Sequence, residues 1–266
     1  MQIQYKDFKF DLSKPIDISI AIKNGNNNPK AFYAPNTILE PVRLEEFIGS
    51  TTEGGILNFK NIFLNPHGNG THTECLGHIT ENNFTINECL KEFHHLAQLV
   101  TIKPETLENG DTIITEKQIK QLSFNKNAKA IIIRTLPNDD DKLSKDWSGA
   151  NHTYIHHLAM KILVENDFEH FLIDSPSVDK QDDNGKLLAH KTFWGLLNDS
   201  TQKRGAVHVD DSYSLERKNC TITEMVYIPN EVKDDLYLMN IQIISLEMDA
   251  SPSKILLFSH AKAQSR

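Results

Sequence analysis

The stretch Asn65-Pro66-His67-Gly68-Asn69-Gly70-Thr71-His72-Thr73-Glu74-Cys75-Leu76-Gly77-His78 gathers three imidazoles and a carboxylate among glycines. Neutral imidazole and carboxylate are the ligands that suit Zn²⁺, Mn²⁺ or Fe²⁺ in catalytic sites. In an extended backbone His72 and Glu74 point to the same face, so both can reach one ion. Gly68 and Gly70 permit a sharp turn and a close approach to a ligand. A glycine-rich surface turn is the simpler alternative, but such a turn gives no reason to concentrate donors. The stretch predicts a metal site.

Apolar runs on both sides of this stretch predict the strands that carry it. Gly55–Leu64 is typical of a strand that runs directly into the motif, which would hold the ligands at a strand end. Alternating or continuous β-branched runs predict further strands within residues 11–20, 98–102, 130–134, 171–174, 236–245 and 255–259. Residues 89–99 stay open between a short helix and a loop.

Two helices are predicted between these strands. The capping-box pattern that begins at Thr115 indicates a short helix. Tyr154–Glu165 is predicted as a helix because Ile155, Leu158, Ala159 and Ile162 lie on one face. A strand, a helix and a second strand at this spacing favour a parallel pair covered by helices. We therefore expect an α/β fold in one domain, residues 1–266.

Composition narrows the classes of function. The net charge of −8 argues against a nucleic-acid-binding surface, which needs a basic face. No apolar run approaches the roughly 20 residues that span a bilayer, and the first residues do not resemble a secretory signal. The three cysteines are far apart in the sequence, so we expect reduced thiols in a cytoplasmic protein. Small-molecule chemistry, without nucleic acid or membrane, is the expectation that remains.

Several segments together resemble a known family. Gly70–His78 is in register with the motif His-x-Gly-Thr-His-x-Asp-x-Pro-x-His, and Ile173–Asp179 resembles a Gly-Ile-Asp-Thr-Pro-Ser-Val-Asp segment. The opening Asp11-Leu12-Ser13 with Pro15, the residue His190 and the residue Glu224 follow the same order as their counterparts. On these residues the chain resembles the putative cyclase family of metal-dependent hydrolases, which includes bacterial kynurenine formamidases.

This resemblance implies a swivelling β/β/α cyclase-like fold, with a mixed sheet and covering helices, in a homodimer or higher homo-oligomer. It also implies one or two divalent ions, with Zn²⁺ expected and Mn²⁺ as the alternative. Carried over residue by residue, the metal ligands are His67, His72, Glu74, His190 and Glu224, and His78 is the general acid/base.

The chain departs from the family pattern in several places. His67 stands one residue further from His72 than the motif expects, and Glu74 replaces an aspartate. Lys191 takes the second position of a His-His pair, and the segment 192–223 is longer than in the formamidases. That insertion is expected to reshape the substrate pocket.

The expected chemistry is hydrolysis of a small amide C–N bond, with an arylformamide as the leading substrate. Bound Zn²⁺ lowers the pKa of water to about 7 and so supplies hydroxide, which would attack the carbonyl while His78 transfers the proton. Phe32 and Tyr33, in a polar loop, are candidates for substrate contact. The alternatives are a metal-dependent cyclase or lyase, and a protein that binds metal and a small ligand without turnover.

Two rival sites in the sequence are weaker. A Cys75 thiolate could act as nucleophile with a neighbouring histidine, although a small cysteine more often packs as a hydrophobic residue. The cluster His208-Val209-Asp210-Asp211 could bind a metal, but it more simply forms a polar face of the insertion.

Overall fold

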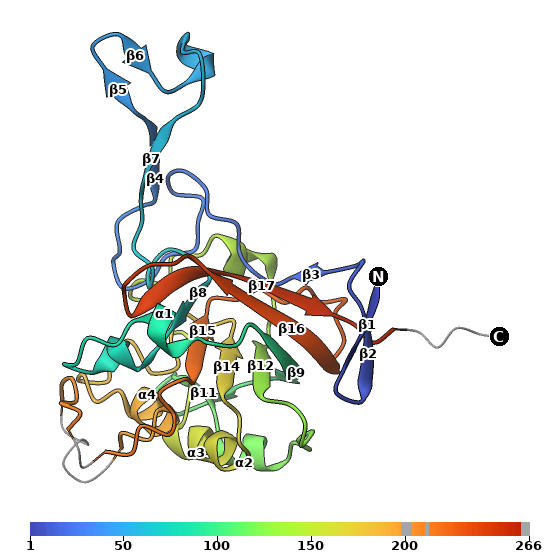
Figure 1. Ribbon diagram of the computed structural model, residues 1–266. Coiled ribbons are helices and arrows are strands. Elements are labelled where there is room, and N and C mark those ends of the chain that lie inside the picture. The colour runs from blue at the N-terminus through green and yellow to red at the C-terminus, as the bar shows by residue number, and fades with distance from the viewer. Residues whose placement is uncertain (198–203, 211–212, 262–266) are drawn as a thin grey trace.

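A closed, mixed β-sheet forms the body of the protein (Figure 1). The computed structural model describes residues 1–197, 204–210 and 213–261. The strands of this sheet, in the described part of the chain, are β3 (Ile16–Asp17), β8 (His72–Glu74), β9 (His94–Ile102), β12 (Ala130–Thr135), β14 (His170–Ile173), β15 (Thr221–Glu224), β16 (Leu236–Ile243) and β17 (Ala250–Phe258). Their spatial order is β16-β9-β12-β14-β15-β8-β17-β3. The additional pairing of β16 with β17 closes the ring and leaves β3 as an outer strand on β17.

Strand direction divides the ring into two parts. β9, β12, β14 and β15 are parallel to one another, whereas β8, β16 and β17 pair antiparallel with their neighbours. The expected α/β fold with a mixed sheet is therefore confirmed. β8, which carries the centre of the His/Glu motif, lies between β15 and β17.

Smaller elements surround the ring. The short ladders are β1 (Gln2–Tyr5) with β2 (Phe8–Asp11), β4 (Ile38–Pro41) with β7 (Lys60–Phe63), β5 (Arg43–Leu44) with β6 (Phe47–Ile48), and β10 (Glu105–Thr106) with β11 (Thr112–Ile114) and β13 (Tyr154–Ile155). The α-helices are α1 (Ile86–Cys89), α2 (Glu116–Lys120), α3 (His157–Glu165) and α4 (Leu188–Phe193). The 3-10 helices are η1 (Thr51–Glu53), η2 (Leu76–Ile79) and η3 (Asp140–Leu143). Across the described ranges, every helix is too short or too polar to cross a lipid bilayer.

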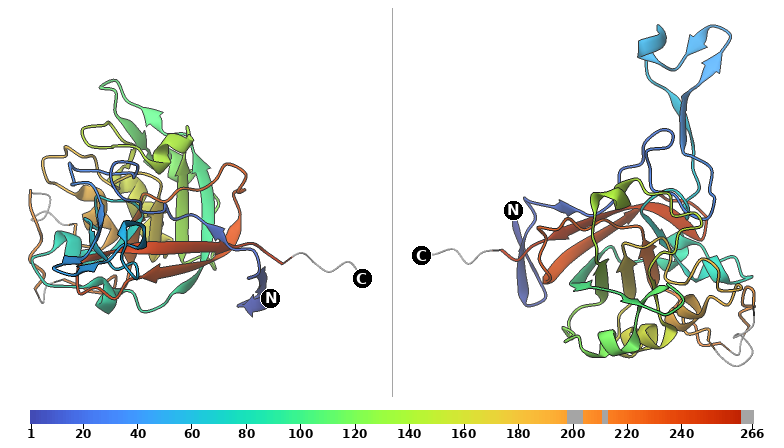
Figure 2. Two further views of the ribbon diagram at one scale, coloured as in Figure 1. Left: turned by 90° about the horizontal axis from the view of Figure 1, so that it is seen from above. Right: turned by 180° about the vertical axis from the view of Figure 1, so that it is seen from behind.

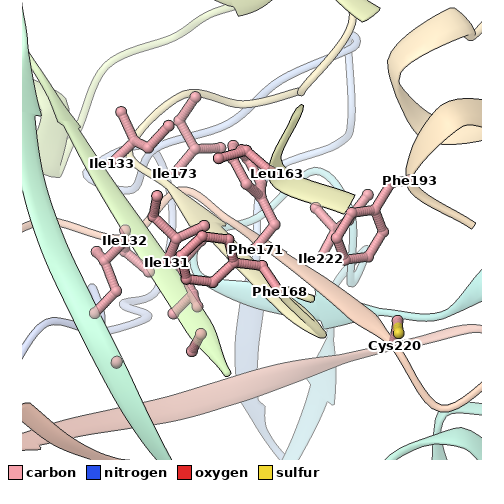
Figure 3. Packing of buried hydrophobic residues seen from close by; sticks show 14 of the residues in the cluster. Ile131, Ile132, Ile133, Leu163, Phe168, Phe171, Ile173, Phe193, Cys220 and Ile222 are labelled. Carbon is pink, nitrogen blue, oxygen red and sulfur yellow. The ribbon is translucent and has the colours of Figure 1, made fainter. Parts of the chain in front are cut away.

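The core lies between the parallel strands and the helices α2, α3 and α4, which gather on one side of the sheet (Figures 1 and 2). Every residue of β12 and β14 is buried, as expected for parallel strands that are covered on both faces. Figure 3 shows the isoleucines of β12 packed with Phe171 of β14, with Leu163 of α3 and with Phe168, which lies between α3 and β14. This packing fixes the strands whose carboxyl ends approach the candidate site.

Long-range pairing changes several predicted boundaries. The predicted helix Tyr154–Glu165 begins only at His157, because Tyr154 and Ile155 pair with β11 as β13. Its buried face is Ala159, Met160 and Leu163. Of the predicted stripe, Ile155 and Ala159 are buried and Ile162 is partly buried, while the prediction for Leu158, which is 40% exposed, was wrong. The predicted strand Gly55–Leu64 is limited to β7, since residues 55–59 are irregular with a bend at residues 56–57. The open segment 89–99 divides between the end of α1 and the start of β9.

An arm projects from the body (Figures 1 and 2). It consists of the β4–β7 ladder with β5, β6 and η1 at its end, residues 38–63. Its exposed apolar side chains include Leu44, Ile56, Phe59, Ile62 and Phe63. An isolated two-stranded hairpin is only marginally stable in water, so a surface of this kind favours a further packing partner.

Candidate metal centre

Strand pairing brings His72 opposite Glu224. In the antiparallel ladder of β8 and β15, these two residues are direct partners. The side chains of directly opposite residues lie close together on one face of a sheet. His72 Nε2 is 3.4 Å from Glu224 Oε2, and both residues are buried. The amide N–H of Val178 donates to Glu224 Oε1 at 2.9 Å, which holds the carboxylate in place.

A tight turn brings His67 to the same place. Within it, the Gly68 amide donates to Asn65 Oδ1 at 2.9 Å and the Asn69 amide to the Asn65 carbonyl at 3.0 Å. Gly68 is required here because a Cβ at this position would lie 2.3 Å from the Cβ of Ala34. The turn therefore accommodates the extra residue before His72 by packing directly on the loop that carries Phe32.

Glu74 is the centre of the cluster. Its side chain is fully buried, and its Oε2 is 3.1 Å from His67 Nδ1 and 3.8 Å from His78 Nε2. Its Oε1 accepts a hydrogen bond from His190 Nε2 at 3.1 Å. Burial alone would raise the pKa of the Glu74 carboxyl, but the imidazoles of His78, His190 and His67 hold this pKa well below its usual value. Glu74 is therefore an anion that several histidines share.

The pKa values of the histidines follow from the same contacts. Burial acts to lower the pKa of His67, but the hydrogen bond to Asp249 and the nearby Glu74 carboxylate raise it to about 10. Burial likewise opposes the charge on His190, and the carboxylates of Asp179 and Glu74 raise its pKa well above the ordinary value. Without a divalent cation, protons on these rings balance the carboxylates. A bound cation would take over that role, with release of protons.

The donor set fits a divalent metal. His67, Glu74 and His78 form one group whose ligand atoms all lie within 4.8 Å of one another, and His72, Glu74 and Glu224 form another. Among the buried side-chain atoms of the described residues, His72 Nε2 and Glu74 Oε2 both lack a hydrogen-bond partner. His72 Nδ1 lies 3.0 Å from the Gly70 carbonyl oxygen, so it donates there and leaves Nε2 with a free lone pair. Such orphaned buried atoms are costly unless something binds them.

A comparison with known protein families now places the chain. The model of the family described as putative cyclase matches residues 10–180, well over half of the sequence. The chain belongs to the putative cyclase family. Among curated protein sequences, none matches it significantly.

Solved structures share the fold at low sequence identity. One is described as a potential metal-dependent hydrolase with cyclase activity; it is 17% identical, has a TM-score of 0.62, and the match covers 92% of this chain and 97% of that one. Another is isatin hydrolase A from Labrenzia aggregata, 13% identical with a TM-score of 0.65, over 93% of this chain and 94% of that one. A third is a predicted metal-dependent hydrolase from Bacillus stearothermophilus, 16% identical with a TM-score of 0.59, over 92% and 98%. These likenesses confirm the cyclase-like fold.

The fold of this putative cyclase family member brings all five predicted ligands together. His67, His72, Glu74, His190 and Glu224 lie around one centre, with His78 beside them. Their role as ligands stays a prediction, because it follows from the family resemblance and from proximity. Glu224 reaches the centre even though the long 192–223 segment precedes it, since it ends β15.

Two site carboxylates had no assigned role in the sequence analysis. Asp179 Oδ2 accepts from His190 Nδ1 at 2.7 Å, and its two oxygens also accept the amides of Ala189 and His190. The resemblance of Ile173–Asp179 to a family segment was the available signal. Asp249 Oδ2 lies 2.8 Å from His67 Nε2 and 3.4 Å from His78 Nδ1. Nothing near Asp249 in the sequence marks it, because only closure of the ring brings it to the motif.

The predicted substrate residues lie near the centre to different degrees. Phe32 packs edge-on against His152, with ring centroids 6.5 Å apart. His152 is buried, and its Nε2 donates to the carbonyl of Asp179, whose carboxylate accepts from His190. Phe32 is therefore linked to His190 through His152 and Asp179. Tyr33 is 75% exposed. Substrate contact by Phe32 and Tyr33 stays a prediction.

The rival sites gain no support. Cys75 is fully buried, and its contact with Cys89 together with burial raises the pKa of its thiol, which disfavours a thiolate. His208 is exposed and pairs with Glu81 at 3.3 Å rather than with the predicted ligands. Asp211, the last residue of that cluster, lies outside the described residues.

Proposed function

We propose that this protein is a metal-dependent hydrolase that cleaves the C–N bond of a small amide, with an arylformamide as the leading substrate. The observation that carries the proposal is the convergence of imidazoles and carboxylates on two buried atoms without partners, His72 Nε2 and Glu74 Oε2. The similarity of the fold to isatin hydrolase and to metal-dependent hydrolases supports the same reaction class.

Five residues would hold the metal, which we propose to be Zn²⁺ with Mn²⁺ as the alternative. Glu74 is the one carboxylate common to both candidate groups of the described residues, so it would help to hold a metal in either group. His190 contacts both Glu74 and Glu224, which places it beside the group that includes His72. When bound, a divalent ion of this kind lowers the pKa of water and polarises a carbonyl.

His78 is the proposed proton carrier. It is 31% exposed in its side chain, whereas His72 and His190 are buried, so a substrate could reach His78 from solvent. Its Nε2 is 3.8 Å from Glu74 Oε2, and its Nδ1 is 3.4 Å from Asp249. An imidazole held between two carboxylates can take a proton from water and return it to a leaving nitrogen.

The test joins metal content with turnover. Purified wild-type protein, His72→Ala and Glu74→Gln would be analysed for metal and assayed on arylformamides and cyclic amides. We expect the wild type to carry a divalent metal and hydrolyse at least one amide, and both variants to lose metal and activity together. His208→Ala is the matched control, because that histidine is exposed and pairs with Glu81. Full activity in a metal-free Glu74→Gln variant would refute the proposal, and metal without turnover would indicate a binding protein.

We also propose a cytoplasmic homodimer in which the projecting arm, residues 38–63, packs against a second copy. The exposed Ile56, Phe59 and Ile62 of the arm support an interface, because exposed apolar patches of this kind mark interaction sites. β7 ends four residues before His67, so a partner that packs on the arm would also adjoin the metal centre. The three buried free cysteines support a reducing compartment.

A further inference from the structure

Asp249 has a fixed position behind the metal centre. It immediately precedes β17, and its carbonyl accepts the amide of Cys75 at 2.9 Å, directly after Glu74. The carbonyl of Met248 accepts the amide of Ile86 at 2.7 Å. The backbone around Asp249 is thus tied to Cys75 of the motif and to the first residue of α1. Its carboxylate has little freedom to move away from the histidines.

That carboxylate contacts two histidines at once. Asp249 Oδ2 is 2.8 Å from His67 Nε2 and 3.4 Å from His78 Nδ1. The two rings lie against each other, with centroids 4.2 Å apart and planes inclined by 31°. The remaining nitrogens, His67 Nδ1 and His78 Nε2, both face Glu74 Oε2, at 3.1 and 3.8 Å.

The two carboxylates therefore lie on opposite edges of the ring pair. If Asp249 accepts one N–H from each ring, the lone pair of the other nitrogen is directed at Glu74 Oε2, the atom without a hydrogen-bond partner. Metal-binding histidines commonly donate their second N–H to a carboxylate, which fixes the tautomer and the ring orientation. The displaced His67 has a particular need of such a support, since its turn contains one residue more than the family motif.

We propose that Asp249 is a positioning residue that aligns His67 for the metal ion and holds His78, the proposed proton carrier, beside it. This inference rests on the proposed function, because it concerns the same divalent ion. Asp249 acts through the two rings, because it contacts His67 Nε2 and His78 Nδ1 and leaves the other nitrogen of each ring facing Glu74.

The test is a metal-binding measurement on metal-free protein. Zn²⁺ and Mn²⁺ would each be titrated calorimetrically into wild type, Asp249→Asn and Glu247→Gln. Glu247 is a matched control, since it lies in the same loop but bonds Thr85 and Asn87. We expect Asp249→Asn, which keeps the shape of the side chain, to bind metal about 10- to 100-fold more weakly. Glu247→Gln should bind like the wild type.

A double-mutant cycle separates positioning from a general loss of structure. If Asp249 acts through His67 and His78, Asp249→Asn should weaken metal binding far less in a His67→Ala/His78→Ala background than in the wild type. The inference is overturned if Asp249→Asn binds within about threefold of the wild type, or if its effect is equal in both backgrounds. A wild-type chain that takes up no divalent ion would instead overturn the proposed function, and this inference with it.

Discussion

Replacing Lys142 by methionine should lower the free energy of unfolding, because it leaves the buried carboxylate of Asp174 without its cation. The Lys142 ammonium donates to Asp174 Oδ2 and to the Thr135 carbonyl, both at 2.8 Å, and it also contacts Thr135 Oγ1 and Asn138 Oδ1. The side chains of Lys142 and Asp174 are 8% and 0% exposed. Methionine occupies a similar volume and preserves the packing of the aliphatic stem. What the substitution removes is the charge and its hydrogen bonds.

The expected loss is about 3–5 kcal/mol in the free energy of unfolding at neutral pH, the usual effect of removing one partner from a buried ion pair. Burial raises the pKa of the Asp174 carboxyl, and Lys142 and Thr135 oppose this rise. Without Lys142 the pKa in the folded protein must rise further. Below that pKa the carboxyl is protonated and the missing cation matters little, whereas above it an unpaired anion stays buried. The deficit relative to wild type should therefore grow as the pH rises from acid to neutral.

The assay is urea unfolding at about pH 5 and about pH 8, with Lys142→Met/Asp174→Asn to test recovery. Lys161→Met is the control, because Lys161 and Glu165 form an exposed pair at 3.7 Å that should contribute at most about 1 kcal/mol. A loss below about 1 kcal/mol for Lys142→Met, or a loss equal at both pH values, would refute the reasoning.

Two further predictions concern the turn and the arm. Gly68→Ala should destabilise the protein by about 1–3 kcal/mol and weaken metal binding, because the new Cβ would lie 2.3 Å from that of Ala34. Urea unfolding and metal titration would measure both effects, and Ala34→Gly in the same chain should restore both. Unchanged stability and metal binding in Gly68→Ala would contradict the requirement for glycine in this turn. The triple variant Ile56→Ser/Phe59→Ser/Ile62→Ser should convert a dimer to a folded monomer in light scattering; a wild type that is already monomeric, or a variant that stays dimeric, would count against the arm as the interface.

The sequence predicts the part of the candidate site whose residues lie close together in the chain. His72 and Glu74 point to one side of β8 because residues two apart in a strand do so, and both proved buried at the centre. The run at residues 130–134 is a buried parallel strand, as its β-branched composition indicates. The approach of Glu224 was also anticipated, although only through the family resemblance.

The predictions from sequence fail where contacts between distant segments determine the secondary structure or the site. Tyr154 has the pattern of a helix start, but pairing with Ile113 places it in β13 instead. Tertiary contacts outweigh such local preferences, which amount to only about 1 kcal/mol per residue or less. Asp249 lies far from His67 in the chain, and only the pairing of β17 with β8 makes them neighbours. Spacing in the sequence carries no information on that contact.

Closure of the ring has a consequence for the order of events during synthesis. The segment His67–His78 leaves the ribosome long before Glu224 of β15 and Asp249, which precedes β17. A nascent chain therefore carries an incomplete set of donors that could hold a metal ion only weakly. Because a preformed site rarely exists before folding, ion binding and the final pairing of β17 should reinforce each other. Selection of the metal then belongs to a late stage of folding, after Glu224 and Asp249 have reached the motif.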